Sequence, residues 1–274
     1  MTNHPILVLG GTGKAGRRVA ARLRALDVPV RVPTRSGPLP FDWTDDTTWP
    51  AALAGARAVF VVPFDGLLLT RPFVARAVAA GVERIVLLSG RGLDVPDYPQ
   101  ITSGATHSDG EAAVRAADVA WTVLRPTWFA QNFSEGFFRD AVAAGDLRLP
   151  AGDGAVGFVD ADDIADVAVA ALTGSGHGGH TYELSGPRAL SMAEAAAEIA
   201  TATGRPVRYT ALDLATYRAE LVAAGWPESD ARELGLVVTA VRDGLDAYLS
   251  DGVERALGRP PRDFTAFAAA ATWP

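Results

Sequence analysis

The fold is decided by the stretch Ile6-Leu7-Val8-Leu9-Gly10-Gly11-Thr12-Gly13-Lys14-Ala15-Gly16. A continuous aliphatic run that ends in glycines is typical of a buried parallel strand. Behind the glycines, Val19, Leu23 and Leu26 recur at the spacing of one face of an amphipathic helix. The stretch therefore predicts a strand, a tight glycine turn and a helix, in that order.

The glycines have the spacing of a phosphate-binding loop. Gly10, Gly13 and Gly16 form G-x-x-G-x-x-G, and Gly11, Gly13 and Gly16 also satisfy G-x-G-x-x-G. Such a loop lets the backbone approach a pyrophosphate and places the anion at a helix N-terminus. The pattern alone is weak, but a strand before it and a helix after it support a dinucleotide site. The alternative is a glycine turn that binds nothing; we expect cofactor contacts from Gly10, Thr12, Gly13, Lys14, Ala15 and Gly16.

The end of the second expected strand, residues 29–34, favours NADP(H) over NAD(H). An acidic residue there would accept hydrogen bonds from a ribose 2′-hydroxyl, but the chain has Thr34-Arg35-Ser36 and no carboxylate before Asp42. A guanidinium and hydroxyls suit a doubly charged 2′-phosphate, and Lys14 is a further candidate for that group. We predict NADP(H) as the cofactor; otherwise Arg35 is a solvated surface arginine.

Strands and helices alternate along the first half of the chain. Strands are expected at 58–62, 85–88 and 121–124, and helices at 47–53 and 70–80. Ser108 and Glu111 have the spacing of a capping box, which predicts a helix from there to about Ala117. This alternation predicts a doubly wound parallel sheet of the Rossmann type.

The pattern loosens after Pro126. We expect a short strand at 158–159, a helix at 163–172, a strand at 182–184 and a helix from the Ser191/Glu194 capping box to Gly204. Helices broken at 225–227 and 258–261 follow. The predicted organisation is an NADP-binding Rossmann domain at 1–150, and at 151–274 a mixed segment that completes the sheet and forms a smaller, mainly helical C-terminal substrate lobe.

Composition excludes several classes of protein. The 274 residues carry a formal net charge of −7 and no cysteine, which argues against nucleic-acid binding and rules out disulfides and cysteine-ligated metals. No apolar run approaches the roughly 20 residues of a membrane span, and no secretion signal is visible. We expect a cytoplasmic monomer or homodimer without a bound metal. The pair His177 and His180 is interpreted as part of a loop and not as a metal site. The carboxylates of Asp160, Asp162 and Asp163 are interpreted as stabilising the start of a helix.

The usual proton-transfer pair of short-chain dehydrogenases is missing. That pair is Tyr-x-x-x-Lys, in which the lysine lowers the tyrosine pKa, but the sole lysine is Lys14 and no tyrosine has a lysine four residues later. No G-x-S-x-G nucleophile motif is present either. A ketone develops an alkoxide during hydride transfer and needs an acid, whereas an iminium loses its charge and needs none. An iminium or a quinone-like acceptor therefore suits this chain better than an alcohol.

Over nearly its whole length the chain resembles the NmrA-like group of atypical short-chain reductases. The resemblance rests on Gly10–Lys14, Phe41–Trp43, Val86–Ser89 and, most specifically, the Leu-Arg-Pro-Thr-Trp-Phe-x-x-Asn-Phe block at 124–133. Within the group it is most similar to ergot-alkaloid-type reductases, festuclavine synthase and agroclavine dehydrogenase, and their bacterial relatives. Those fungal enzymes reduce a cyclic iminium with NADPH. The group also includes quinone and azo-dye reductases, and NADP-binding redox sensors.

The resemblance implies where cofactor and substrate lie. Asp42 and Trp43 would flank the adenine, Pro63 and Phe64 would lie along the cofactor, and the nicotinamide would be contacted by Ser89, Gly90, Pro126 and Thr127. His107 falls at a position that relatives fill with lysine or histidine. In a loop before a helix it is either a proton donor or ribose contact, or a structural histidine. Ser89 either binds the substrate or nicotinamide amide or only closes a turn.

The aromatic block after Pro126 is the candidate substrate site. Trp128, Phe129 and Phe133 would form the walls around a flat molecule, and the face of Trp128 would stabilise a cation; core packing is the alternative, expected for at least one of them. Asn132 is either a pocket contact or a satisfied buried amide. We predict an NADPH-dependent reductase of a small cyclic or aromatic compound, first an imine or iminium. A quinone or azo reductase and a non-catalytic NADP sensor are the alternatives.

Overall fold

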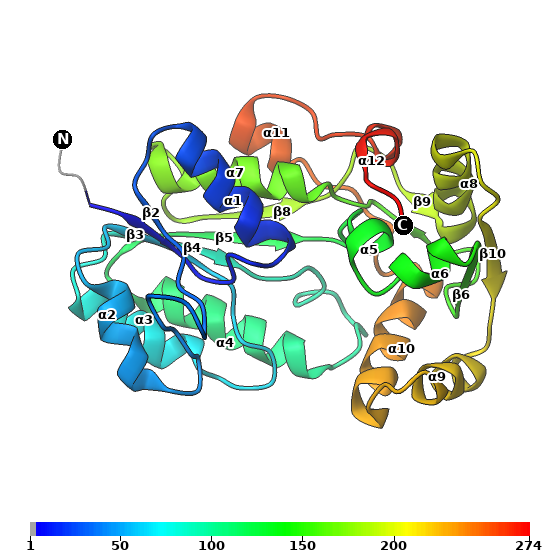
Figure 1. Ribbon diagram of the computed structural model, residues 1–274, viewed down its shortest axis with the longest axis horizontal. Helices are drawn as coiled ribbons and strands as arrows, with labels where there is room; N and C mark the ends of the chain where they lie inside the picture. Colours follow the sequence, from blue (N-terminus) through cyan, green and yellow to red (C-terminus); the bar gives the residue numbers. More distant parts are fainter. Residues whose placement is uncertain (1–3) are drawn as a thin grey trace.

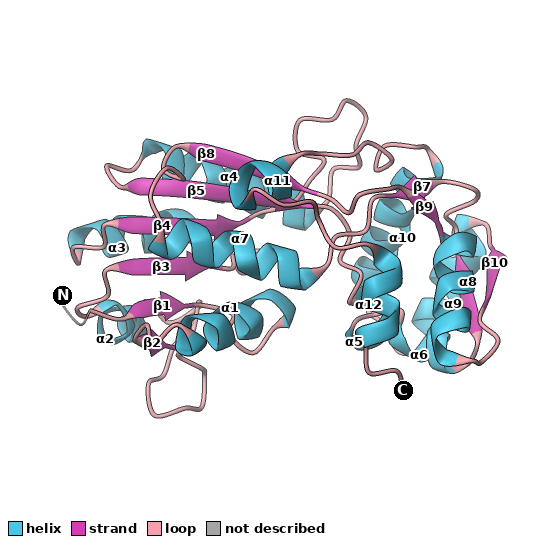
Figure 2. Ribbon diagram, turned by 90° about the horizontal axis from the view of Figure 1, so that it is seen from above, coloured by secondary structure: helices cyan, strands magenta, loops and turns pink. Residues whose placement is uncertain are grey.

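A six-stranded parallel sheet forms the centre of one half of the molecule (Figures 1 and 2). The structure is a computed structural model and describes residues 4–274. The strands are β1 (Ile6–Val8), β2 (Val30–Arg31), β3 (Ala58–Val61), β4 (Arg84–Leu88), β5 (Ala120–Pro126) and β8 (His180–Leu184). Their spatial order is β2-β1-β3-β4-β5-β8, and all neighbouring strands are parallel. The order reverses at β1, so the crevice beyond the carboxyl ends of β1 and β3 is where open sheets of this kind bind ligands. The predicted Rossmann-type fold is confirmed.

The sheet is buried on both faces, which explains its uninterrupted aliphatic runs. In β1, Ile6 and Val8 pack on one face of the sheet and Leu7 packs on the other, and all three are fully buried. Figure 1 shows the two helical layers. One layer contains α1 (Lys14–Ala25), α7 (Ala161–Thr173) and α11 (Gly252–Leu257), and the other contains η1 (Asp46–Thr48), α2 (Trp49–Leu53), α3 (Thr70–Ala79) and α4 (Thr102–Ala116).

A second lobe lies beyond the carboxyl ends of the strands (Figure 2). It has its own apolar core, in which the Phe133 ring contacts Phe138, Phe158 and Phe264. The division predicted at residue 150 stays a prediction; the lobe already includes three elements before it. Its elements are α5 (Asn132–Glu135), α6 (Arg139–Ala143), β6 (Asp146–Leu149), β7 (Ala155–Val156), β9 (Leu190–Ser191), α8 (Met192–Thr203), β10 (Arg208–Ala211), α9 (Leu214–Ala223), α10 (Glu228–Arg242) and α12 (Phe264–Ala270).

Most of the predicted strands and helices are present. The Ser191/Glu194 capping box starts α8, and Gly204 ends it in the left-handed conformation with φ of 67°. The second strand is shorter than expected, and the strand predicted at 158–159 is a single bridge between Phe129 and Val159. Leu26, expected on the buried stripe of the first helix, lies just beyond the end of α1 and is 59% exposed.

The helix predicted to start at Ser108 starts six residues earlier, at Thr102. Ser108 and Glu111 therefore lie in the middle of α4, and Glu111 caps nothing. A free backbone N–H group at the start of α4 finds its acceptor on another element: the N–H of Thr102 donates to Glu233 of α10 at 3.2 Å. The capping-box prediction was wrong because the cap of this helix comes from the opposite lobe.

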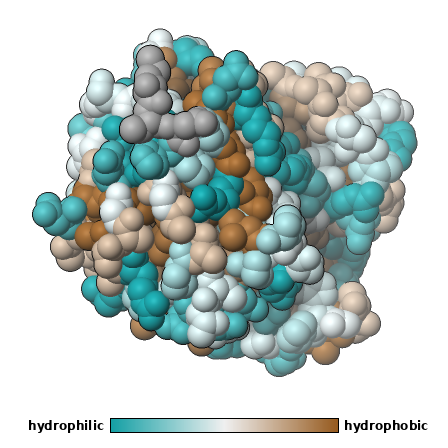
Figure 3. All heavy atoms as spheres, turned by 60° about the vertical axis from the view of Figure 1, so that its left-hand side comes forward, coloured by the Kyte–Doolittle hydropathy of each residue, from teal (hydrophilic) through white to brown (hydrophobic). Residues whose placement is uncertain are grey.

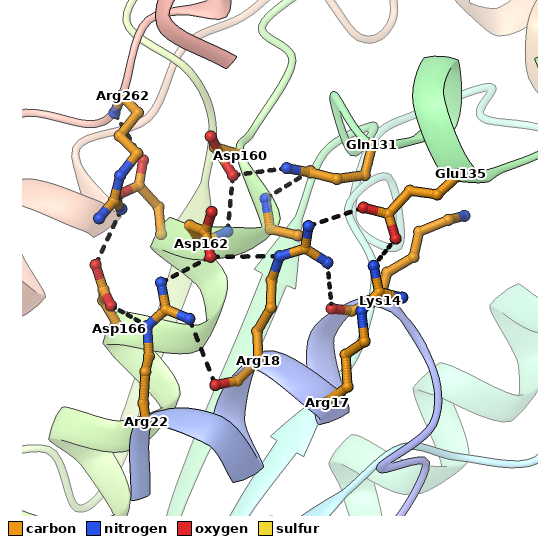
Figure 4. Close-up of polar contacts among 12 residues, drawn as sticks. Lys14, Arg17, Arg18, Arg22, Gln131, Glu135, Asp160, Asp162, Asp166 and Arg262 are labelled. Carbon is orange, nitrogen blue, oxygen red and sulfur yellow. Dashed lines mark hydrogen bonds and ion pairs between the residues drawn. The ribbon is translucent and has the colours of Figure 1, made fainter. Parts of the chain in front are cut away.

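Ion pairs join α1 to both halves of the molecule (Figure 4). Arg18 Nη2 donates to Glu135 Oε1 of α5 at 2.8 Å, and Arg17 pairs with the same carboxylate. Arg22 Nη2 lies 2.7 Å from Asp162 Oδ1 of α7. The helix that follows the glycine turn is thereby tied to the start of the second lobe as well as to its own layer.

The carboxylates read as helix-start residues have structural partners. Asp160 caps α7 by accepting from the backbone N–H of Asp162 at 2.8 Å. Asp163 is fully buried and pairs with Arg259 and Arg262 of the segment before α12. These contacts fix the C-terminal segment against the sheet half.

The side of the molecule where the strands begin comes forward in Figure 3. Hydrophobic groups there are interleaved with hydrophilic side chains. Among residues 4–274, no helix combines the length and the apolar character needed to cross a membrane.

Candidate functional site

The glycine turn has the close approaches that a phosphate-binding loop requires. Gly10 has φ of 64°, and a Cβ on Gly16 would lie 2.3 Å from the Gly10 carbonyl oxygen. Only glycine fits these positions without moving the backbone. Gly13 caps α1 without a side-chain hydrogen bond, so the first N–H groups of this helix point toward an open turn. Thr12 and Gly13 are exposed there, while Ala15 and Gly16 are buried. The turn therefore fits a dinucleotide pyrophosphate.

The segment after β2 presents the predicted Arg35 to solvent. Arg35 and Ser36 are exposed, and Thr34 is half-buried in the bridge that closes this loop on Pro40. Lys14, suggested for the same phosphate, turns elsewhere: its Nζ donates to Asn132 Oδ1 at 2.8 Å. In the loop after β2, Arg35 is therefore the cation that a bound 2′-phosphate would contact.

Asp42 and Trp43 lie beside that loop. Trp43 packs edge-on against Phe41 and Phe73, with ring centroids 5.4 and 5.1 Å apart. Hydrogen bonds from the backbone N–H and the hydroxyl of Thr44 lower the pKa of Asp42. Its carboxylate is therefore engaged locally, and Trp43 offers an aromatic edge at the position expected for an adenine.

A cavity of about 890 Å³ opens at the carboxyl ends of β3, β4 and β5. Its walls come from the loop after β3, the loop between β4 and α4, the segment after β5, and α10 of the second lobe. The cavity therefore lies between the two halves of the molecule. Of the predicted site residues it brings together Lys14, Pro63, Ser89, Gly90, His107, Pro126, Thr127, Trp128, Phe129 and Asn132.

Phe64 and Phe133, predicted beside the cofactor and the substrate, do not line this cavity. Phe64 follows Pro63 but is 40% exposed. Phe133 is fully buried in the core of the second lobe, against Phe138, Phe158 and Phe264. The substrate contact predicted for Phe133 is thus wrong, because the first turn of α5 rotates this ring into the lobe. The core-packing alternative holds for it.

Ser89 is held by a buried ion-pair network that the sequence did not reveal. Its hydroxyl donates to Glu111 Oε1 at 2.7 Å. Arg125 donates one hydrogen bond to each oxygen of the same carboxylate, both at 2.7 Å. Glu111 is 1% exposed, and hydrogen bonds from Arg125 and Ser89 outweigh its burial and lower its pKa. The network fixes the ends of β4 and β5, where the predicted nicotinamide contacts lie.

His107 lies inside α4 and not in a loop, as the earlier start of the helix requires. Its ring faces Gly90: a Cβ there would lie 2.9 Å from the His107 Nδ1. Burial lowers the pKa of His107, and the carboxylates of Asp65 and Glu111 offset that only in part. The ring is therefore mainly neutral at pH 7, and its position over Gly90 suits a hydrogen bond to a bound molecule.

The segment after β5 supplies the aromatic wall. Trp128 stacks on Phe138 at 5.9 Å and meets Phe137 edge-on, while Phe129 is half-buried at the cavity. Asn132 accepts from Lys14, so its amide has a partner and also faces the cavity. The hydroxyl of Thr127 is buried and has no hydrogen-bond partner within the described chain, which fits a bound polar group at this position.

Two further polar residues in the cavity were missed by sequence reasoning. Asp246 is 1% exposed; its carboxylate accepts from Trp128 Nε1 at 3.1 Å and from the Tyr98 hydroxyl at 3.2 Å. No local signal marks either residue, because Asp246 and Trp128 are 118 positions apart. Burial raises the pKa of Tyr98 far above its ordinary value, opposite to the change that proton transfer by a tyrosine needs.

Comparisons with known proteins show the family and the fold of this chain. The model of the NmrA-like family matches residues 2–244. An NAD(P)H azoreductase of Xenophilus azovorans is 35% identical, with 97% of both chains covered. Festuclavine dehydrogenase easG of Aspergillus fumigatus is 34% identical, with 96% of both covered. The fold is also that of the NADPH-dependent quinone oxidoreductase QOR2 from Escherichia coli, with a TM-score of 0.82 at 24% identity over 96% of this chain and 98% of that one.

Proposed function

We propose that this chain, which belongs to the NmrA-like family, is an NADPH-dependent reductase of a small cyclic or aromatic molecule, with the C=N bond of an imine or iminium as its first choice of acceptor. The expected family and the broader class of NAD(P)H-dependent oxidoreductase are supported by relatives named as an azoreductase and a festuclavine dehydrogenase. NADP(H) is the cofactor that fits the residues after β2.

One observation carries the proposal: one cavity joins the carboxyl ends of the strands to the aromatic wall of the segment after β5. In an open parallel sheet the cofactor lies across these strand ends. Trp128 and Phe129 line the same space and would hold a flat acceptor there. Lys14 lies in this cavity and also begins the helix after the glycine turn, so the two binding regions are contiguous.

Bound NADPH supplies a hydride to the acceptor carbon. The protein's part is to bind, orient and exclude water. The Glu111–Arg125 network holds Ser89 and the ends of β4 and β5 in place, and the buried Thr127 hydroxyl is free to bond a polar group of the nicotinamide or acceptor. The N–H groups at the start of α1 hold phosphate charge, and Arg35 holds the 2′-phosphate.

The preferred class of acceptor follows from which proton donors the cavity contains. Lys14 is bonded to Asn132, and the raised pKa of Tyr98 makes it a poor proton-transfer partner, so the Tyr/Lys route of ketone reduction is absent here. An iminium needs no proton when it receives a hydride, and the face of Trp128 stabilises its charge before transfer. These features favour C=N over an ordinary ketone.

A second candidate is an azo or quinone reductase on the same site. The 35% identity to an NAD(P)H azoreductase over the full length favours it. His107 would then supply or position the proton that a quinone oxygen or azo nitrogen requires.

The test is a panel of acceptors followed through the loss of NADPH absorbance. Purified protein is given cyclic imines, azo dyes, quinones and ketones, each with NADPH and separately with NADH. Faster NADPH loss with cyclic imines than with all others supports the first candidate, and a preference for azo dyes or quinones supports the second. Tight NADP(H) binding without turnover of any acceptor would instead identify a sensor and refute the reductase.

A further inference from the structure

A buried carboxylate, Asp246, faces the cavity from the segment after α10. Only 1% of the residue is exposed, and two donors hold it: Trp128 Nε1 at 3.1 Å and the Tyr98 hydroxyl at 3.2 Å. Neither donor is charged, so the negative charge of the carboxylate is not neutralised by these contacts. A buried charge of this kind is costly unless a partner of opposite sign approaches it.

The charge of Arg91 acts on Asp246 but does not neutralise it. Arg91 makes no ion pair with it; its Nη1 donates to the Tyr248 carbonyl at 2.6 Å and its Nη2 to the Ser250 hydroxyl at 3.0 Å. The guanidinium also stacks on the Tyr248 ring, with Cζ 4.0 Å from the centroid. Arg91 is therefore committed to the loop that carries Asp246, and its charge reaches the carboxylate only at longer range.

The charge of the whole cavity has the same sign as Asp246. Besides Asp246, its lining includes the carboxylates of Asp65, Asp230 and Glu233. The cations among the described lining residues are Lys14 and Arg91, so the four carboxylates outnumber them, and His107 is mainly neutral at pH 7. A cationic molecule entering from the α10 side thus meets favourable charge and then an aromatic wall.

We propose that Asp246, positioned by Tyr98 and Trp128, is the residue that selects acceptors with a positively charged nitrogen. Its carboxylate binds the N–H or N-alkyl end of the cation while the indole of Trp128, oriented by the same carboxylate, contacts the flat part of the molecule. Asp246 contributes no electrons; a neutral imine takes one proton from the protonated Asp246 carboxyl and becomes the iminium, which leaves Asp246 as the carboxylate paired with it. The proposal rests on the reductase function, but Asp246 can be tested by binding alone.

The contrast between a cation and a neutral molecule of the same shape isolates this role. N-methyltetrahydroisoquinoline is protonated at neutral pH, and its lactam N-methyldihydroisoquinolinone is neutral. Calorimetry on the NADP⁺-saturated full-length protein gives the dissociation constant of each. We expect the wild type to bind the cation at least about tenfold more tightly than the lactam, as a partly buried charge pair allows.

Asp246→Asn should remove that preference and leave lactam binding and NADP⁺ binding within about twofold of wild type. The asparagine oxygen still accepts a hydrogen bond, so the change removes charge with little change in shape. Asp243→Asn is the matched control, because Asp243 is exposed, three residues away, and outside the cavity lining. Retention of the cation preference in Asp246→Asn, or an equal loss for cation and lactam, would overturn the proposal.

A measurement on the wild type alone covers the case in which Asp246→Asn does not fold. Burial raises the pKa of Asp246 despite the hydrogen bonds from Trp128 and Tyr98, and the facing tyrosines Tyr98 and Tyr248 have raised pKa values and stay neutral. The charge of the Arg91 guanidinium acts on the same group and lowers its pKa in part. Cation affinity should therefore weaken as the pH falls through the Asp246 range, while lactam affinity stays level; parallel profiles would contradict the proposal.

The two hypotheses fail separately. If the wild type reduces cyclic imines but Asp246→Asn keeps the cation preference, this inference is wrong and the reductase function stands. If no acceptor consumes NADPH but the cation preference depends on Asp246, the reductase function is wrong and the binding role of Asp246 stands.

Discussion

Removal of Glu111 is the sharpest test of how the site is held. Glu111 is 1% exposed and sits on α4, where it accepts two hydrogen bonds from Arg125 of β5 and one from Ser89. Arg115, one turn later, adds a fourth contact at 2.8 Å. Glu111→Ala leaves Arg125, itself 7% exposed, without the partner that neutralises it. The substitution should therefore destabilise the whole sheet half.

The size of the effect follows from what remains around Arg125. Breaking a buried ion pair by removing one partner costs about 3–5 kcal/mol. Two carboxylates compensate in part: Asp94 also contacts Arg125, but its side chain is 76% exposed, and Glu183 lies 3.8 Å away. We therefore expect a loss at the lower end, about 3 kcal/mol in the free energy of unfolding.

Urea unfolding followed by circular dichroism measures this loss. With a slope of about 3 kcal/mol per molar urea for a chain of this size, the midpoint of Glu111→Ala should fall by roughly 1 M. Asp46→Ala is the control, since its pair with Arg76 is 57% and 49% exposed and should be worth less than about 1 kcal/mol. Equal midpoint shifts in the two variants would refute the buried-pair reasoning.

The pH dependence of the same pair has a definite sign. The pKa of Glu111 is lowered in the folded protein, so its contribution to stability is present above the unfolded pKa of about 4.3 and is lost as the pH falls through the folded value. The stability difference between wild type and Glu111→Ala should be level from pH 6 to 8 and narrow in acid. A difference that widens in acid would contradict this assignment.

Three other changes test the cofactor and the reaction. Arg35→Ala should weaken NADPH binding, measured by nicotinamide fluorescence, by about tenfold while NADH binding changes little; equal losses would remove the 2′-phosphate assignment. Gly16→Ala would place a Cβ 2.3 Å from the Gly10 carbonyl oxygen, so NADPH binding by calorimetry should be lost or the thermal midpoint lowered; unchanged binding and midpoint would argue against the close approach. His107→Asn should slow quinone turnover more than turnover of a preformed iminium; equal slowing would show that His107 only binds the cofactor.

Local signals in the sequence were enough for the sheet and the phosphate loop. The strand, turn and helix of residues 6–25 follow from neighbours in the chain, since the contact that requires glycine at position 16 is with Gly10 and lies within the loop itself. The Ser191/Glu194 capping box was read correctly for the same reason: both hydrogen bonds close within one turn.

The same pattern misled at Ser108 because the decisive partners are distant. Glu111 could have reached back to a local N-cap, but Arg125 and Ser89 take up its carboxylate in the buried space between α4 and the sheet. The helix then extends back to Thr102, whose N–H finds Glu233 across the cavity, 131 positions away. A spacing rule contains no information on either contact.

The candidate site was predictable in location and less so in detail. Strand ends are set by the sheet, so Ser89, Gly90, Pro126 and Thr127 line one cavity as expected. Which ring of an aromatic block faces the cavity depends on how a short helix is rotated, and the four-residue α5 turns Phe133 into the lobe's core. Asp246 was out of reach because its role depends on a tryptophan in another element.

The contacts of α1 explain why the glycine turn and the aromatic wall belong to one site. Lys14 begins α1 and donates to Asn132 at 2.8 Å, the first residue of α5, while Arg18 reaches Glu135 at the end of α5. Trp128 and Phe129, just before α5, line the cavity. Hydride transfer tolerates misplacement of less than about an ångström, so the distance between the cofactor and the acceptor must be set by rigid contacts. In the proposed function it would be set by side chains that join the two binding regions directly, at the sole lysine of the chain.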